Sequence, residues 1–372
     1  MDTMAPKSLL KAIPWLLAGP FFYLLFRLSF LWPDFTETVY SRGIFRFVNQ
    51  GVSSLTGLLS FSLAEMLLYA FLLFCVVFFL WALICAALAQ RKWWFVLIKR
   101  FAALLCVFSC LYALFIGVWG FNYARNSLGE NLGLDASPAT VEELYSACEA
   151  LVQRANALRS KVPEGPGGVF EPGFSKAEMM GRTAYYYDKA ARETGEYILG
   201  GSFGNAKPML NSALLSYAFL SGFYFPFTGE ANVNADAPML YFPASCLHES
   251  AHQRGFARED EANFLAFFVS FYSGDACVEY SGTMLALTEA MNRLYEQDRD
   301  LYFGLRENYV PGIDRDLKQN SAYWRRFESP VEEASREVNN TFLKANNQPE
   351  GVKSYGRMTD LVIGLWRKGL LK

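Results

Sequence analysis

Histidine is nearly absent from this sequence, because its 372 residues include only His248 and His252. A zinc site made of three histidines is therefore excluded. Charged residues are also few, at 19%, whereas apolar residues make up 52% and aromatic residues 16% of the chain. These fractions differ from those of ordinary soluble enzymes and indicate that part of the chain lies in a membrane.

Disulfide bonds have few partners available. Seven cysteines are present, and three of them, Cys148, Cys246 and Cys277, lie outside the long apolar stretches. Because three cysteines cannot pair completely, one disulfide at most can form among them and no disulfide framework is expected. The other four are expected to pack in the apolar stretches as small apolar side chains: Cys75, Cys85, Cys106 and Cys110.

Charge divides the chain into two parts. Residues 1–121 carry nine basic and four acidic side chains, which leaves 25 basic and 32 acidic ones for residues 122–372. The acidic balance of the second part argues against nucleic acid as its partner. We therefore predict a membrane region over 1–121 and, over 122–372, a domain long enough to bury its own core.

Three membrane-spanning helices are predicted in the first region. Residues 66–89 and 101–121 carry no charge, and each stretch has about the 20 apolar residues that a bilayer core requires. A third stretch, about 12–32, is interrupted by Arg27 and two prolines. A secretory signal peptide is the alternative for this stretch, but the apolar run continues without a small-residue cleavage site, so we expect an uncleaved first span.

Orientation follows from the loop "QRKWWFVLIKR" at 90–100, which holds four bases. Because basic loops stay cytoplasmic, we expect a multi-pass protein of the cell (inner, cytoplasmic) membrane with its C-terminal domain extracytoplasmic. The uncharged stretch 209–227 would move the histidines to the cytoplasm if it formed a fourth span. We instead expect a β-hairpin or an edge pair of strands over 222–234, since aromatic residues there are followed by the turn-forming "TGEANVNADAP".

The sequence "HESAH" at 248–252 indicates a metal site. Histidines four residues apart lie on one face of a helix, where both imidazoles can bind one zinc ion. Glu249 lies beside them and can act as general base toward a zinc-activated water. Two histidines on an ordinary helix are the alternative, but this pattern uses every histidine of the chain, which chance placement rarely produces.

The third zinc ligand has to come from a residue other than histidine. Metzincins place it six residues after the second histidine, and here that position holds Arg258, which cannot bind zinc. Glu259, Asp260 and Glu261 follow, in the first turn of the next predicted helix, and all three are candidates. An acid that is not used as a ligand would favourably face the positive end of the helix dipole.

The group that stabilises an oxyanion during peptide hydrolysis cannot be a histidine either, since none remains. A tyrosine or an arginine would have to serve, and the candidates are Tyr272, Tyr355, Arg258 and Arg357. Cys246 is also close to the motif, but its neighbours are typical of a strand that would turn its thiol away from the metal.

The segment "EDEAN" at 259–263 resembles the "ExxAD" segment of gluzincin membrane peptidases of the CAAX-processing type. The resemblance implies that Glu259 binds zinc and that residue 263 supports a histidine ligand. In this chain Asn263 replaces the aspartate of that segment, and Glu261 remains the alternative third ligand.

Three longer blocks, "FYFPFTGEANVN", "CLHESAHQRGFAREDEANFLAF" and "GVKSYGRMTDLV", resemble the bacterial membrane-protein family called domain of unknown function 3810. The resemblance covers nearly the whole chain and implies a membrane-anchored, zincin-like protein without identifying a substrate. We therefore expect a mainly α membrane protein with three N-terminal transmembrane helices. An α+β zincin-like extracytoplasmic domain, mostly helical with a small sheet or hairpin, is expected to follow them.

The expected function is zinc-dependent hydrolysis of peptide or protein substrates by an enzyme anchored in the lipid bilayer. A non-catalytic zincin-fold protein with a binding, sensing or envelope-assembly role is the alternative, because a third histidine is missing and the oxyanion partner is unidentified. Intramembrane proteolysis is disfavoured, since the charged stretch "HQRGFARED" beside the histidines would be costly at bilayer depth.

Overall fold

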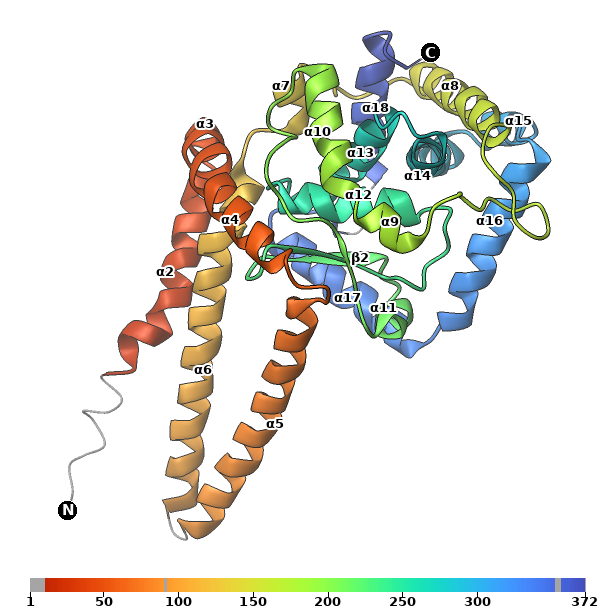
Figure 1. Cartoon of the computed structure of the whole chain (residues 1–372). Coiled ribbons are helices and arrows are strands. Elements are labelled where there is room, and N and C mark those ends of the chain that lie inside the picture. Colours follow the sequence, from red (N-terminus) through yellow and green to blue (C-terminus); the bar gives the residue numbers. More distant parts are fainter. Residues whose placement is uncertain (1–10, 90–91, 352–355, 372) are drawn as a thin grey trace. The chain divides into compact units, whose positions relative to one another are not determined.

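The computed structural model describes residues 11–89, 92–351 and 356–371, which are mostly helical and include one small sheet (Figure 1). The prediction of a mainly α protein with a small sheet is confirmed. The chain folds as two compact units. The helical unit comprises residues 1–45 and 63–125, and the globular unit comprises residues 46–62 and 126–372.

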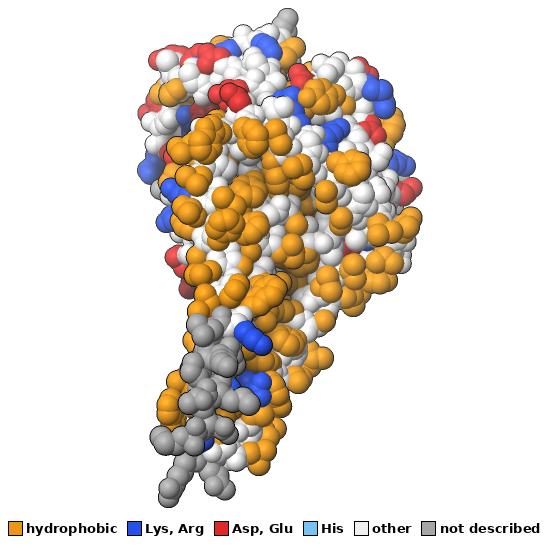
Figure 2. Space-filling model, turned by 90° about the vertical axis from the view of Figure 1, so that its left-hand side faces the viewer, with side chains coloured by type: hydrophobic (Ala, Val, Ile, Leu, Met, Phe, Trp, Pro, Cys, Tyr) orange, Lys and Arg blue, Asp and Glu red, His pale blue; other side chains and the backbone are white. Residues whose placement is uncertain are grey.

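The helical unit contains two helices that are long and apolar enough to cross a membrane, α5 (Leu63–Leu88) and α6 (Trp93–Val118). Each has 26 residues, and at about 1.5 Å per residue each exceeds the roughly 30 Å of a bilayer core. In Figure 2 hydrophobic side chains make up much of the coloured surface. A third candidate, α2 (Ile13–Ser29), counts as a span only as a broken pair with the helical stretch after it, so two or three spans fit the structure.

The loop between the two long helices is shorter than the sequence predicts. A basic loop was expected over 90–100, whereas α6 already begins at Trp93 and includes Lys99 and Arg100. An apolar helix can carry such bases near its end because their long side chains extend along neighbouring surface: the Arg100 guanidinium lies 3.5 Å from the centre of the Trp81 ring. The expected spans 66–89 and 101–121 overlap α5 and α6 over most of their length.

Short helices complete this unit around a buried carboxylate. They are α3 (Pro33–Phe35), the π-helix η1 (Thr36–Phe45) and the 3-10 helix η3 (Gly120–Ala124). Glu37 in η1 accepts hydrogen bonds from Arg42 at 2.6 Å and from Arg125 at 2.7 Å. Because Glu37 and Arg125 are both buried, loss of one would leave the other as an uncompensated buried charge.

The globular unit is built around a three-stranded sheet of order β1-β3-β2. β1 (Lys207–Pro208) runs parallel to β3 (Glu230–Val233), and β2 (Gly222–Phe225) pairs antiparallel with β3, with Gly222 opposite Val233. Within the described residues, no strand pairs with the outer edge of β2. The hairpin expected within 222–234 is therefore present. The preceding stretch contains only the six-residue helix α11 (Ser212–Tyr217), too short to cross a bilayer.

Helix α12 (Phe242–Gln253) lies between this sheet and a helical layer (Figure 1). It contacts β2 and β3 and also α13 (Glu259–Phe271) and α14 (Ala276–Gln297). α8 (Val141–Arg159) and α18 (Met358–Arg367) pack on α14 and close the apolar core. The sheet on one side and the helices α13 and α14 on the other therefore hold α12 in a fixed position.

Shorter helices cover the remaining surface of the globular unit. α4 (Arg46–Thr56) belongs to this unit although it precedes α5 in the chain. The other helices are α7 (Leu128–Leu132), α9 (Lys176–Met180), α10 (Thr183–Thr194), α15 (Arg299–Arg306), α16 (Pro311–Trp324), the 3-10 helix η4 (Arg325–Phe327) and α17 (Pro330–Ala345).

Candidate metal centre

Helix α12 brings the two histidines onto one face, as their spacing predicts. The helix starts with Pro243 in its first turn, where the missing N–H of proline costs no hydrogen bond. One turn separates His248 from His252, and their Nε2 atoms lie 3.1 Å apart. His252 is buried and His248 is nearly so. Both imidazoles thus point their Nε2 atoms at a common, mostly enclosed position.

A tight turn between α12 and α13 fixes the orientation of His252. Gly255 has a φ of +88°, a left-handed conformation that glycine adopts without a steric penalty. The chain then folds back so that the carbonyl of Phe256 accepts a hydrogen bond from His252 Nδ1 at 2.7 Å. Because a carbonyl can only accept, Nδ1 carries the proton and Nε2 keeps its lone pair for a cation.

Asn263 on α13 fixes the orientation of His248 through a hydrogen bond. Its Oδ1 lies 2.8 Å from His248 Nδ1 and accepts that proton. The lone pair of His248 is then also on Nε2, on the side of His252. The supporting role that the "ExxAD" resemblance implies for residue 263 therefore has a geometric counterpart here, with an amide oxygen in place of a carboxylate.

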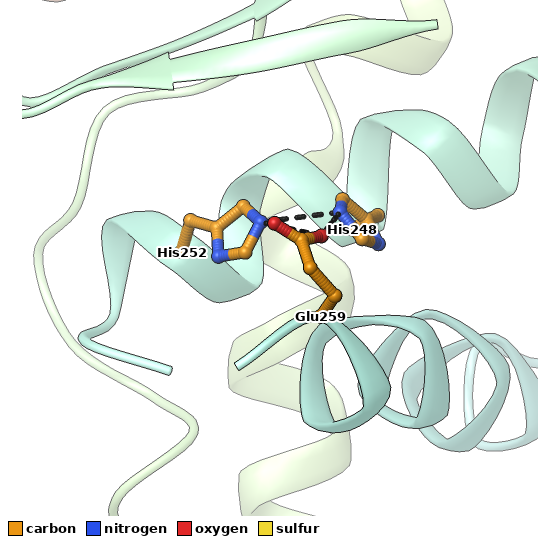
Figure 3. Close-up of side chains that lie close together, drawn as sticks. All are labelled: His248, His252 and Glu259. Atoms are coloured by element: carbon orange, nitrogen blue, oxygen red, sulfur yellow. Dashed lines mark hydrogen bonds and ion pairs between the residues drawn. The ribbon is translucent and has the colours of Figure 1, made fainter. Parts of the chain in front are cut away.

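Glu259, the first residue of α13, completes the group. Its Oε2 lies 3.2 Å from His248 Nε2 and 3.5 Å from His252 Nε2 (Figure 3). Zinc bound tetrahedrally at about 2.0–2.1 Å from each ligand separates the ligand atoms by about 3.3 Å. The three side chains therefore fit a metal ion without rearrangement, and they form a potential metal-binding group in the described part of the chain.

Electrostatics at this position favour positive charge. Burial lowers the pKa of His252, but the carboxylates of Glu259 and Glu249 outweigh it and raise that pKa to about 9. Burial conversely raises the pKa of Glu259, but His252 and His248 outweigh it and hold the pKa well below its usual range. A carboxylate and two imidazoles arranged in this way attract either a proton or a metal cation.

Glu249 lies between α12 and the sheet. It is buried, and its Oε2 makes no hydrogen bond within the part of the chain that the structure describes. Burial, with a contribution from Glu259, raises its pKa to about 7, although His248 and His252 act in the opposite direction. A buried carboxyl oxygen without a partner is unusual in folded proteins and is often found at functional sites.

Gly222, the first residue of β2, makes room for Glu249. A Cβ atom at residue 222 would lie 2.7 Å from Cγ and Oε1 of Glu249, and 2.6 Å from the Asn232 carbonyl oxygen. Any side chain there would push the Glu249 carboxyl out of position. Sequence reasoning missed Gly222, because its proximity to Glu249 depends on how the sheet packs on α12.

The other two acids of the first turn of α13 point elsewhere. Glu261 Oε1 accepts hydrogen bonds at 2.8 Å from the backbone N–H of Leu128 and from Arg258 Nη1. Asp260, Glu261 and Arg258 line a separate cavity of about 190 Å³ together with Arg357. The structure thus brings Glu259, and neither Glu261 nor Asp260, to the histidines.

Among the residues that the structure describes, the expected oxyanion partners are not brought to this position either. Arg258 is engaged with Glu261, and Tyr272 follows the last residue of α13, about 20 Å along the helix axis from Glu259. Tyr355 lies outside the described residues. Cys246 is buried on helix α12 rather than on a strand, and burial raises the pKa of its thiol.

Comparison with known proteins identifies a family. A search of the curated proteins finds no similar protein, and a search of the solved structures finds none. The family model described as "Protein of unknown function (DUF3810)" matches residues 40–363, a range that includes α5, α6, the sheet and the whole histidine site. This match covers most of the chain, so the protein belongs to the DUF3810 family, as its sequence blocks predict.

Proposed function

We propose that this protein is a membrane-anchored, zinc-dependent metallopeptidase of the zincin type. The observation that carries the proposal is the convergence of His248 Nε2, His252 Nε2 and Glu259 Oε2 beside the buried carboxyl of Glu249. Imidazole and carboxylate ligands suit zinc, and three protein ligands leave one position for water, as in catalytic rather than structural zinc sites.

A bound metal and one carboxyl group of the chain would share the chemistry. A zinc ion held by the two imidazoles and the Glu259 carboxylate would acidify a bound water and polarise the peptide carbonyl. Glu249, one residue from a ligand, accepts the proton of the attacking water and delivers it to the leaving amine. Burial raises the pKa of this carboxyl, which makes it a stronger proton acceptor than an exposed glutamate. Asn263 and the Phe256 carbonyl hold the two imidazoles in the tautomer that binds metal.

The edge of the sheet supports a peptide as the substrate. β2 has an outer edge without a partner strand in the described residues, and Gly222 at its start lies against Glu249. An extended peptide that hydrogen-bonds to this edge would run past the general base in a fixed register. Successive side chains of an extended peptide point to opposite sides, so every second side chain of the substrate would contact the enzyme and determine its sequence preference.

The decisive experiment uses the purified full chain and its Glu249→Gln variant. Zinc content is measured by mass spectrometry, and cleavage is measured on a peptide library. We expect about one zinc per chain in both proteins and at least a hundredfold lower cleavage rate in the variant, since glutamine cannot accept the proton. Equal cleavage by the two proteins would contradict the role of Glu249.

A non-catalytic binding protein is the second candidate. It is favoured by one observation: the described residues expected to stabilise an oxyanion are engaged elsewhere. Arg258 pairs with Glu261, Arg357 lines the separate cavity, and Tyr272 follows the far end of α13. Stoichiometric zinc in the wild-type chain, with no cleavage of any library peptide, would support this candidate over the peptidase.

The membrane anchor is proposed to have three spans, α2, α5 and α6, with the globular unit outside the cytoplasmic membrane. Four basic residues would stay on the cytoplasmic side: two between α5 and α6, at 91 and 92, and two near the start of α6, at 99 and 100. Reporter fusions test this topology. Alkaline phosphatase fused after residue 126 is expected to be active, whereas the same enzyme inserted at residue 90 is expected to be inactive.

A further inference from the structure

Helix α4 reverses the usual arrangement of an amphipathic helix. Its polar residues Asn49, Ser53 and Thr56 recur on one face and are buried. Asn49 Nδ2 donates to the Gln253 carbonyl at the end of α12 (2.5 Å), and Thr56 Oγ1 donates to the Thr228 carbonyl (3.0 Å). The outward side of α4 is apolar and exposes Phe47, Val48 and Leu55.

The short helix α11 repeats this reversal. It buries Ser212 and Ser216, whose hydroxyl oxygens accept hydrogen bonds at 2.9 Å from the Ala235 backbone N–H and from the Asn234 side-chain amide. Leu214 and Tyr217 of the same helix are exposed by 51% and 49%. In both helices hydrogen-bonding groups attach the helix to the unit and several apolar side chains stay exposed, although α11 also buries Leu215.

The chain around both helices contains no charge. Residues 47–62 include no acidic or basic residue, and neither do residues 208–229. In the first segment Leu58, Leu59 and Phe61 are exposed as well. A surface that met only water would be expected to carry charged residues among these side chains.

Helix α17 adds a third apolar stripe. Val331, Val338 and Phe342 are exposed and recur at helical spacing, and the charged residues of α17 occupy its other exposed side. Ser335 Oγ donates to the Ala218 carbonyl at 2.9 Å, which attaches α17 beside the end of α11. In Figure 1, α11 and α17 lie on one side of the small sheet, and α8 and α15 lie on the other.

We propose that the exposed apolar residues of 47–61, 210–217 and 331–342, here called the apolar face, lie on the surface of the lipid bilayer. Phe61 precedes the apolar 26-residue helix α5 by two residues, so the chain places it within roughly 7 Å of the start of a membrane-spanning helix. The face has no charge in its first two segments and would therefore bind by burial of apolar side chains rather than through anionic headgroups. A lipid surface fits both the direct connection of the first segment to α5 and the lack of charge. The inference does not depend on the metal site.

Photo-crosslinking of the full chain in lipid nanodiscs tests this contact. p-Benzoylphenylalanine replaces Phe47, Tyr217 or Phe342, one aromatic residue from each segment of the face. Matched controls place the same residue at Tyr185 in α10 and at Phe303 in α15, which are exposed by 55% and 54%. Because every exchange replaces one exposed aromatic ring by another, the fold should be kept, and size-exclusion chromatography of each variant verifies this.

Lipid adducts, detected by mass shift, are expected to be at least about tenfold more abundant at the three face positions than at the two control positions. The yield should be the same in zwitterionic and in anionic nanodiscs and should not fall at high salt, since no headgroup charge is used. Adduct yields at the face no higher than at the controls would overturn the proposal. Crosslinks from the face to a second copy of the chain, in place of lipid, would overturn it as well.

Discussion

Helices α12 and α4 both bury polar side chains, and the two cases differ in where those side chains point. In α12 the buried His252 and its neighbour His248 face a position where metal-ligating atoms from two helices converge. In α4 the buried Asn49 and Thr56 are each hydrogen-bonded to a backbone carbonyl of a neighbouring segment. The first arrangement leaves lone pairs available for a cation, whereas the second uses its donors for attachment.

The comparison shows that the role of a buried polar residue can be inferred only from the groups that it contacts. The proposed metal would account for α12, because three ligand atoms converge on one position and Glu249 Oε2 makes no hydrogen bond in the described part of the chain. An apolar solvent on the outer side explains α4, because its hydrogen bonds are already complete on the inner side. The two helices meet where Asn49 binds the Gln253 carbonyl. The predictions below test the two explanations separately.

The largest expected effect is a difference in zinc content between variants of two glutamates in the first turn of α13. Glu259→Gln should reduce bound zinc from about one per chain to below about a tenth, since it removes the only anionic ligand of the proposed site. Glu261→Gln is the matched control, and it should keep its zinc, because Glu261 is bonded to Leu128 and Arg258 instead. Zinc content after dialysis is the measurement. Equal loss in both variants would show that charge near the helix start, and not ligation, holds the metal.

Gly222→Ala is expected to lower the rate of peptide cleavage by about a hundredfold while zinc is retained. The added Cβ would meet the Glu249 carboxyl at 2.7 Å and displace the general base, and a shift of about 1 Å in a catalytic group costs that much. Gly304→Ala is the control, because a Cβ there meets nothing within 4 Å. Steady-state kinetics and zinc content are compared for the three proteins. A normal rate in Gly222→Ala would show that Glu249 has no role at its present position.

Asn263→Ala should weaken zinc binding by about 10–100-fold, the usual cost of removing a group that orients a ligating histidine. Asn263→Asp keeps an oxygen that can accept the His248 Nδ1 proton and should restore binding. Competition with a fluorescent chelator measures the dissociation constants. If both variants bind as tightly as the wild type, the hydrogen bond to His248 does not support the site.

Much of this site could be predicted because it depends on local spacing. His248 and His252 lie one helical turn apart, and so do Glu259 and Asn263, so one face of each helix carries its site residues. Spacing alone left Glu259 and Glu261 both open as the third ligand, and only the resemblance to the "ExxAD" segment favoured Glu259. The two glutamates lie about 200° apart around α13, so only one of them can face the histidines. The long helices α5 and α6 were predictable for a similar reason, since uncharged runs identify them directly.

The remaining features depend on contacts between distant segments. Gly222 is 27 positions from Glu249 in the chain, and only the packing of β2 on α12 brings them together. In α4 the spacing of Asn49, Ser53 and Thr56 is typical of the solvent-facing side of a surface helix, but the helix is attached by that side. Periodicity identifies two faces of a helix, but it cannot tell which of them meets the protein when the opposite face meets lipid.

The smallest expected effect tests α4 by the sign of a stability change. At a buried position of an ordinary helix, exchange of threonine for the equally large valine is neutral or stabilising. Here Thr56→Val would leave the Thr228 carbonyl without its hydrogen bond at 3.0 Å, so we expect a loss of about 1 kcal/mol, or an unfolding temperature lower by about 2–4 °C. The reverse exchange Val48→Thr, on the outward side of the same helix, should change the stability of the detergent-solubilised chain by less than about 0.5 kcal/mol. Thermal unfolding of the full chain gives both values. A stabilised Thr56→Val variant together with a destabilised Val48→Thr variant would show that α4 packs on the protein through its apolar side, as an ordinary amphipathic helix does.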